Sequence, residues 1–360
     1  MSEQRCWVDI ASSAAAAGPS TAQLEVVRQA RAADGSVDAM LALARHCGAV
    51  VPMYGAGGTA RRWELLATIA AEDVSAARIV EAHLDALAVL VEAKQTPVFD
   101  SADLAEIGVS GGSTWGVFAA EASGVKLAAV RQRGGGWRLT GVKPWCSLAG
   151  VLTHALVTAH TPSGRRLFAV ALQDGAVSPT DQKWVARGLQ RVPSTSVEFL
   201  GSAAVPVGPD QWYLDRPGFA WGGAGVAACW FGGAVGVARH VFASSGARAP
   251  DQIANLHLGA IDVALTGVRS MLLVAARQID DRRAGGEAGA IMALRVRAAG
   301  AAAVEEVLQR SAHALGPAPL ALDDRYARRV ADLQMYVRQH HAEHDLAALG
   351  RSLRTQCAPW

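Results

Sequence analysis

Three histidines near the end of the chain have a residue type and a spacing that suit acid–base catalysis or metal binding. His340 and His341 are adjacent, and His344 follows four residues after His340. Because an imidazole titrates near neutral pH, a histidine here could act as an acid or a base. Two imidazoles one helical turn apart also suit a zinc ion, but His340 and His344 have no third ligand, so we predict no metal site. The alternative is a polar face in contact with water.

A second group of polar residues interrupts a long helical pattern from about Val74 to Ala93. The pattern is apolar nearly all round, yet Glu81, His83 and Asp85 fall inside it. Glu81 and Asp85 are one turn apart, and we expect them to form a stripe that faces solvent. The alternative is that this segment lines a site and that His83 reaches the floor of a pocket.

Strand-like segments fill the middle of the chain, from Trp115 to Phe199. They recur at intervals of about ten residues with glycine-rich turns between them, which is typical of a small barrel or of paired sheets. One of these segments ends in the string Gly141 to Ser147, which contains a single indole, Trp145, and a single hydroxyl. An indole can cover a flat apolar ring, and a hydroxyl can donate one oriented hydrogen bond. The alternative is that Trp145 is an ordinary core aromatic residue.

Helical periodicity flanks the strands on both sides. The C-terminal third contains four long helical stretches, at about 219–244, 252–281, 289–315 and 323–349, whose short connections predict a four-helix bundle. The first of them is rich in glycine and alanine, which permits close approach of a neighbouring backbone or of a ligand. We therefore predict an α+β fold with an N-terminal helical domain (1–112), a central small β-barrel or sandwich (113–216) and a C-terminal four-helix bundle (217–360).

Composition excludes several classes of function. The 360 residues carry a formal net charge of only +2, and no basic run interleaves with aromatic residues, so we expect no nucleic-acid partner. The sequence contains no stretch of eighteen uncharged apolar residues, so we expect no membrane span. The chain starts without a signal-peptide pattern, and its five cysteines lack framework spacing. These features predict a cytoplasmic protein in which most of the cysteines are small buried residues.

The order of helices, strands and helices, together with the strings around Trp145 and Ser147, resembles the acyl-CoA dehydrogenase superfamily of flavoproteins. The resemblance extends from about Arg61 to the last helix, and it includes the turn and strand at Gly188 to Phe199. It implies FAD as the cofactor, with FMN as an alternative, and a flavin ring between the β domain and the bundle. Trp145 stands where the family places a tryptophan beside the ring, and Ser147 stands where a threonine or serine donates to flavin N5.

The same resemblance implies further cofactor contacts in the loop after the first strand. The string from Val117 to Gly124 lies where backbone groups of the family bind the flavin pyrimidine. We therefore expect contacts from Phe118, Ala119, Ala120 and Gly124. The region 244–250 lacks the family's Arg-x-x-Phe-Gly string, which grips the FAD pyrophosphate, and this departure keeps FMN or weak FAD binding open.

The resemblance also assigns candidate catalytic residues. His340 falls at or near the position of the family's catalytic glutamate, which the sequence lacks. Flavin-dependent monooxygenases of this fold take active-site histidines from this helix and from an N-terminal helix like the one that carries His83. We therefore predict His83, paired with His340 or His341, as the residues that handle protons.

The function that the resemblance implies is a flavin-dependent oxidoreductase acting on an acyl thioester or a related small molecule. The alternatives are a two-component monooxygenase supplied by a flavin reductase and a catalytically silent member acting as a subunit. The family builds its cofactor sites across subunits, so we expect a homodimer or a homotetramer. A flavin reductase or an electron acceptor is a further expected partner.

Overall fold

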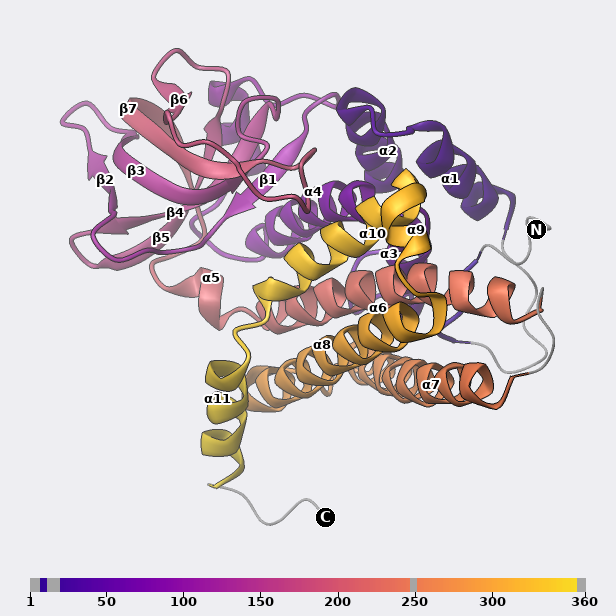
Figure 1. Ribbon diagram of the computed structural model, residues 1–360. Coiled ribbons are helices and arrows are strands. Elements are labelled where there is room, and N and C mark those ends of the chain that lie inside the picture. The colour runs from indigo at the N-terminus through magenta and orange to yellow at the C-terminus, as the bar shows by residue number, and fades with distance from the viewer. Residues whose placement is uncertain (1–6, 12–19, 247–250, 355–360) are drawn as a thin grey trace.

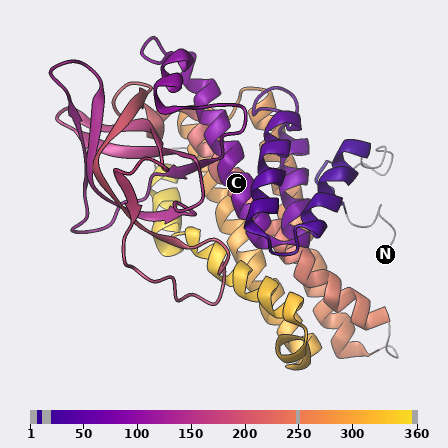
Figure 2. The same cartoon turned by 90° about the horizontal axis from the view of Figure 1, so that it is seen from above.

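Helices, strands and helices follow one another along the chain, as the sequence predicts (Figure 1). The computed structural model describes residues 7–11, 20–246 and 251–354. Cys6, Cys357 and residues 247–250 of the missing cofactor string lie outside the described residues. Figure 2 shows the strands gathered on one side of the helices. The domain boundaries at residues 112 and 216 stay a prediction.

Side-chain caps fix the starts of several N-terminal helices. Ser20 closes a capping box at the start of the first helix, and the Asp73 carboxylate accepts from the amide of Ala76 at the start of the fourth. The fourth helix spans the range that the sequence predicts. The helices are α1 (Thr21–Ala32), α2 (Val37–Val50), α3 (Thr59–Glu72) and α4 (Val74–Ala93), followed by the 3₁₀ helix η2 (Ser101–Ile107).

The strands form a small closed barrel, which confirms the predicted β-barrel. Five of them pair in a ring in the order β4, β2, β3, β7 and β5, and β5 pairs again with β4. Strand β1 adds to β4 in parallel, and β6 adds to β7. The strands are β1 (Trp115–Phe118), β2 (Leu127–Arg131), β3 (Trp137–Ser147), β4 (His154–Thr161), β5 (Gly164–Ala171), β6 (Val177–Pro179) and β7 (Ser194–Val207).

The C-terminal bundle differs from the prediction in its last helix. The stretch expected to be one helix over 323–349 is broken after Tyr336, and Ala342 has a left-handed φ of +46° that no helix continues. His340 therefore lies in a turn, and the helix face that His340 and His344 were expected to share does not form. The elements are α5 (Trp212–Asp215), α6 (Pro217–Gly246), α7 (Gln252–Asp280), α8 (Gly286–Leu315), α9 (Ala318–Leu322), α10 (Asp324–Tyr336), η3 (Val337–Gln339) and α11 (Glu343–Leu353).

Glycines of α6 let it press directly against α3. A Cβ added at Gly232 would lie 2.0 Å from the carbonyl oxygen of Ala67, and one at Gly236 would lie 2.7 Å from that of Ala71. Only glycine fits at such distances. The small residues of α6 thus serve the close backbone approach that the sequence predicts.

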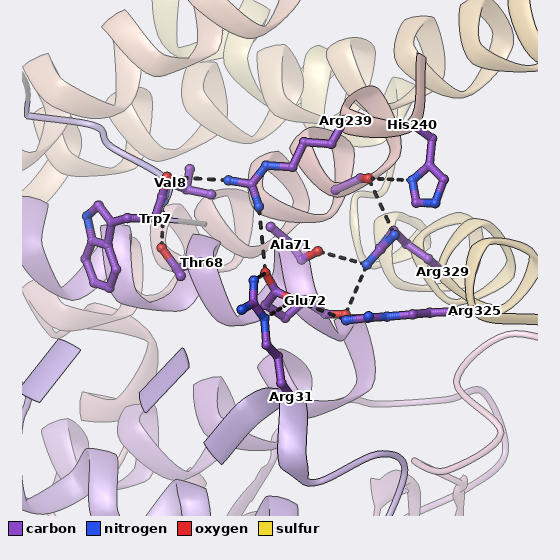
Figure 3. A network of polar contacts seen from close by, with 11 residues as sticks. Trp7, Val8, Arg31, Thr68, Ala71, Glu72, Arg239, His240, Arg325 and Arg329 are labelled. Atoms are coloured by element: carbon purple, nitrogen blue, oxygen red, sulfur yellow. Dashed lines mark hydrogen bonds and ion pairs between the residues drawn. The ribbon is translucent and has the colours of Figure 1, made fainter. Parts of the chain in front are cut away.

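A buried carboxylate ties the N-terminal helices to the bundle (Figure 3). Glu72, at the end of α3, accepts two hydrogen bonds of 3.0 Å from Arg31 of α1 and one of 3.1 Å from Arg325 of α10. Arg239 of α6 lies 3.9 Å from the same carboxylate, and Arg329 donates to the backbone carbonyl of Glu72 at 3.1 Å. Burial alone would raise the pKa of Glu72, but Arg31 and the other arginines hold it below the usual value.

Two of the bundle helices are long and apolar enough to cross a membrane by length and composition alone. In α6, 72% of the most apolar window is buried inside the molecule, as expected for a core helix. In α7, only 22% of that window is buried. The sequence predicts no membrane span because it has no uncharged apolar stretch of eighteen residues, but this criterion does not reveal how apolar and how exposed α7 is.

Candidate functional site

A narrow cleft lies where the barrel meets α4. Strand β1 forms one wall, the end of β3 forms another, and α4 closes the third side. The cleft brings together two of the predicted cofactor residues, Phe118 and Ser147. Its lining also includes Arg78, Ile79, Ala82, Trp115, Gly116, Val117, Leu148, Leu152 and Val192.

A bulge in β3 separates Ser147 from Trp145. The pairing of β3 with β7 shifts register between Lys143 and Cys146, and Trp145 takes a left-handed φ of +59°. As a result the Trp145 indole is 54% exposed on the outer surface, whereas the Ser147 hydroxyl stays in the cleft. The spacing of two residues predicts that both side chains share one face of the strand, but the bulge turns them to different faces.

The Ser147 hydroxyl is held from two sides. Its Oγ lies 2.8 Å from Oγ of Ser194 on β7, and Arg78 of α4 donates to it over 3.4 Å. These contacts fix where the hydroxyl points and place a guanidinium beside it. A hydroxyl next to a positive charge is suited to binding an electron-rich ring edge.

The loop after β1 leads away from the cleft. Ala120 and Gly124 are exposed, Ala119 is half-buried, and none of them lines the cleft. Glu121 instead accepts a 2.7 Å hydrogen bond from the buried amine of Lys143. Burial alone would raise the pKa of Glu121, and the hydrogen bond from Lys143 brings it below its usual value. The predicted cofactor contacts of Ala119, Ala120 and Gly124 stay predictions.

A row of buried charges on α4 continues from the cleft into the bundle. Arg78 donates to Glu81 over 2.9 Å, and Tyr336 of α10 donates to the same carboxylate oxygen over 3.3 Å. Glu81 is only 8% exposed, so the prediction that it faces solvent is wrong. Burial raises the pKa of Glu81 against the opposing charge of Arg78. A carboxylate in this state is suited to accepting and releasing a proton.

Asp85 lies one turn further along the same face. Its nearest cation is Arg216, at 3.9 Å, and burial raises the pKa of Asp85 above the usual value. Helix α6 makes room for this side chain with a glycine, because a Cβ added at Gly222 would lie 2.6 Å from its carboxylate oxygen. The expected solvent-facing stripe is therefore a polar face enclosed between α4 and α6.

The predicted histidine pair does not come together. His83 lies about 200° around α4 from Glu81 and so points to the opposite side of the helix. Its Nδ1 accepts from the backbone amide of Trp115 at 3.2 Å, next to Gly48 of α2. Burial lowers the pKa of His83 to about 4, so the ring is neutral at pH 7. In this position His83 secures the start of β1.

The C-terminal histidines differ from each other in exposure. The His340 side chain is 8% exposed and lies 3.7 Å from the Asp345 carboxylate, with its ring edge against Trp230 of α6. Burial lowers the pKa of His340. The His341 side chain is 74% exposed. Of the two, only His340 is enclosed by the bundle, and the catalytic role of either histidine stays a prediction.

Other reactive groups offer no competing site within the described residues. There, no group of three histidine, cysteine or carboxylate side chains is placed to hold a metal ion. Cys47, Cys146 and Cys229 are buried, as predicted for most of the cysteines, and burial raises the pKa of each thiol.

Comparison with known proteins tests the fold. No protein-family model matches the sequence, and no curated protein matches it. Among solved structures, butyryl-CoA dehydrogenase from Megasphaera elsdenii matches over 94% of this chain and 99% of that chain, with 14% identity and a TM-score of 0.77. The chain has the acyl-CoA dehydrogenase fold. The resemblance and the α+β fold class predicted from the sequence are thereby confirmed.

Two further neighbours of this fold were solved with FMN. KijD3, in complex with FMN and dTDP-3-amino-2,3,6-trideoxy-4-keto-3-methyl-D-glucose, is 19% identical, covers 95% of this chain and 96% of that chain, and has a TM-score of 0.76. FMN-bound TdsC from Paenibacillus sp. A11-2 is 14% identical, covers 94% and 97% of the two chains, and also has a TM-score of 0.76. At these identities the likeness concerns the fold.

The cleft fits a flavin ring in its chemistry, but it is closed. It offers one oriented hydroxyl, the backbone of β1 and apolar walls, which are the groups that a flat heteroaromatic ring needs. Its free volume is about 10 Å³, whereas small-molecule pockets have roughly 300 Å³ or more. A ring can enter only if side chains at the cleft move, and Arg78 is the largest polar one among them.

The sequence contained a signal for the residues that were missed. Arg78, Glu81 and Asp85 are spaced by three and four residues, which puts all three on one face of α4. The rest of that helix is apolar nearly all round, which is typical of a buried helix, so its charged side chains are expected to be buried as well.

Proposed function

We propose that the protein is a flavin-dependent oxidoreductase whose flavin ring binds in the cleft between β1, the end of β3 and α4. The observation that carries this proposal is the Ser147 hydroxyl, held by Ser194 and Arg78 at the junction of barrel and helices. The fold supports it, because neighbours of the same fold were solved with FMN. FMN is the simpler candidate, and FAD remains the alternative.

A bound flavin supplies the redox chemistry, and the chain supplies orientation and charge. Ser147 would donate to the ring edge, and the aromatic ring of Phe118 would help to exclude water from it. Arg78 would place a positive charge beside the ring, which favours its electron-rich reduced form. Trp145 would cover the ring only if the indole turned inward from its exposed position.

Proton transfer is assigned to the buried groups beyond Arg78. Glu81 is the strongest candidate, because its pKa is raised by burial and its carboxylate contacts both Arg78 and Tyr336. His340 is the second candidate, since it is enclosed by the bundle. His83 is assigned a structural role at β1.

The charged face of α4 favours a polar substrate. An aliphatic acyl chain placed against Arg78, Glu81 and Asp85 would remove water from these charged groups and offer them no hydrogen bond in return. We therefore favour a monooxygenase that receives reduced flavin from a partner reductase. Oxidation of an acyl thioester is the second candidate, and the buried Glu81 carboxylate favours it as a base for an α-proton.

Flavin titration tests the binding proposal. We expect the purified protein to bind FMN, with quenching of flavin fluorescence, and Ser147→Ala to weaken the affinity about tenfold through loss of one charge-supported hydrogen bond. Ser178→Ala, an exposed serine of β6, is the matched control and should bind like the unmodified protein. If neither FMN nor FAD binds, the proposal fails and a silent subunit becomes the better explanation.

Two reactions then separate the candidate functions. A monooxygenase consumes oxygen when reduced FMN is supplied and is not reduced by acyl thioesters. A dehydrogenase is bleached anaerobically by an acyl thioester such as butyryl-CoA. Glu81→Gln should slow the reaction that is found at least tenfold while leaving FMN affinity within about twofold.

The remaining assignments concern the setting of the enzyme. We propose that it acts in the cytoplasm, on a small molecule, and as an oligomer of identical chains. A partner reductase is expected only if the monooxygenase reaction is found.

A further inference from the structure

A small cavity lies where α1, the junction of α3 and α4, and α10 meet. Its volume is about 110 Å³, which is too small for an organic cofactor, since such ligands need roughly 300 Å³ or more. A single water molecule takes about 30 Å³ in the liquid, so the space suits a few waters or a small ion. Among the residues that the structure describes, four arginines line this space, which we call the arginine cavity: Arg31, Arg325, Arg328 and Arg329. Figure 3 shows three of them beside Glu72.

Helix α10 presents three of these arginines on one face. Arg328 and Arg329 follow Arg325 by three and four residues, which places them on the same side of a helix. Arg325 donates one hydrogen bond of 3.1 Å to Glu72, and Arg328 forms an ion pair with Asp324. Within the described ranges of the chain, neither guanidinium has a further protein partner that accepts a hydrogen bond. Because each guanidinium carries five N–H donors, most of these donors face water or a ligand.

Arg329 is the most deeply buried of the three, with 7% of the residue exposed. In the described part of the chain its guanidinium donates only to backbone carbonyls, those of Ala71, Glu72 and Gly236, and its Nε has no hydrogen-bond partner. Burial and the neighbouring charge of Arg325 lower the pKa of this guanidinium. A buried cation that has no carboxylate partner is stabilised by an anion placed beside it.

The carboxylates that line the arginine cavity serve mainly to hold its walls in place. Asp73 caps α4 and accepts from Arg191 over 3.1 Å. Asp332 accepts from the Ser75 hydroxyl over 2.7 Å and from a backbone amide over 2.6 Å. The Glu72 carboxylate is shared by arginines of α1 and α10, and Asp34 is exposed. The groups with unused hydrogen-bonding capacity toward a ligand are therefore mainly the guanidinium groups of α10.

We propose that the arginine cavity binds a phosphate group, either as inorganic phosphate or as the phosphoryl end of a small phosphomonoester. A guanidinium pairs with phosphate through two parallel hydrogen bonds, and a tetrahedral oxyanion has enough oxygens to accept from Arg325 and Arg328 at once. It would also supply the negative charge that Arg329 lacks. Val74, the first residue of α4, lines the same cavity, so the positive end of that helix dipole adds to the attraction. The inference does not depend on flavin binding.

Isothermal titration calorimetry of the full chain with sodium phosphate at pH 7 tests the proposal, with sodium chloride at equal ionic strength as the reference. We expect saturable binding of phosphate, and a melting temperature that rises with phosphate and not with chloride. Arg328→Gln should weaken phosphate binding about tenfold, because one charge-assisted contact is lost. Arg310→Gln is the matched control and should bind like the unmodified chain. Arg310 also pairs with a carboxylate one helical turn away, and its side chain is 32% exposed, against 30% for Arg328.

A second variant tests the sign of the charge that the cavity prefers. Asp34→Asn removes an exposed negative charge from the lining and should tighten phosphate binding about threefold. A cavity that prefers cations would lose affinity for its ligand instead. Unchanged circular dichroism and urea midpoints of all three variants would show that the fold is intact.

Glycerol 3-phosphate distinguishes the two sources of the phosphate group. Binding about tenfold or more tighter than that of inorganic phosphate would identify a phosphomonoester as the ligand, because its organic part then adds contacts. Equal or weaker binding would identify the inorganic ion. Either result must show the same loss in Arg328→Gln to support the proposal.

Three outcomes would overturn the inference. One is the absence of saturable binding for both inorganic phosphate and glycerol 3-phosphate. Another is an Arg328→Gln variant that binds phosphate as tightly as Arg310→Gln does, which would place the bound ion elsewhere. The third is an Asp34→Asn variant that binds phosphate more weakly than the unmodified chain.

Discussion

The buried ion pair of α4 can be tested by removing its charges one at a time and then together. Arg78→Met leaves the Glu81 carboxylate without its cation, and Glu81→Met leaves the guanidinium without its anion. The two side chains are only 13% and 10% exposed, so water cannot replace the lost partner. Each single variant is therefore expected to lose about 3 kcal/mol of unfolding free energy.

The double variant Arg78→Met with Glu81→Met should be more stable than either single one. Both desolvated charges leave together, and what is lost is roughly one hydrogen bond each to Ser147 and Tyr336, about 1 kcal/mol apiece. Replacing a buried pair by apolar side chains offsets most of that cost, so we expect the double variant within about 1 kcal/mol of the unmodified chain. It should nevertheless fail to bind flavin normally, because the charge beside Ser147 is gone.

Urea unfolding followed by circular dichroism at pH 7 measures the three free energies, and FMN titration measures the functional loss. The exposed pair Arg28 and Glu25 is the matched control, with the same spacing of three residues and a distance of 2.7 Å but side chains 51% and 42% exposed. Removing a charge there should cost less than about 0.5 kcal/mol. A double variant of the α4 pair that loses as much as the two single variants combined would refute the reasoning.

Three further substitutions probe how the parts are held together. Glu72→Gln should lower the free energy of unfolding by about 2 kcal/mol, because the arginines around Glu72 lose their shared carboxylate. Since the pKa of Glu72 is lowered in the folded chain, this stabilisation is present above about pH 4.3 and is lost as the pH falls through the folded pKa. The pKa of His83 is about 4 in the folded chain and about 6.5 unfolded, so the protein should lose about 2 kcal/mol between pH 7 and pH 5, and His83→Asn should remove that loss. Gly232→Ala should cost about 3 kcal/mol because its Cβ would meet the backbone oxygen of Ala67.

Each of these outcomes is read from urea midpoints against a control. Gly350→Ala is the control for Gly232→Ala, because nothing lies within 4 Å of a Cβ added there. For Glu72→Gln, the difference from the unmodified chain should shrink as the pH is lowered further and the carboxylate protonates. If the loss between pH 7 and pH 5 persists in His83→Asn, another group titrates and the assignment to His83 fails.

The sequence predicts the order of the elements well, because their signals are local. Alternating strands with glycine turns predict the barrel, and the start of α4 follows from Asp73, whose carboxylate caps the helix. The placement of Phe118 and Ser147 in one cleft also follows from the resemblance. For the barrel strands and for α4, the signal and the element that it predicts share the same short stretch of chain.

The errors arise where distant or three-dimensional features decide. The burial of Glu81 depends on Arg78 and on Tyr336, which lies more than 250 residues away along the chain. The exposure of Trp145 depends on a bulge set by the pairing with β7. The separation of His340 from His344 depends on one residue with a left-handed backbone. None of these features leaves a repeating pattern of residue types from which the sequence alone could predict it.

The glycine contacts of α6 limit how the closed cleft can open. At Gly232 the backbones of α6 and α3 already touch, and the Glu72 carboxylate clamps the far end of the same junction. The N-terminal helices and the bundle are therefore held tightly together at this junction. Entry of a ligand into the cleft therefore requires a movement of side chains that line it, such as Arg78, and not a separation of α3 from α6.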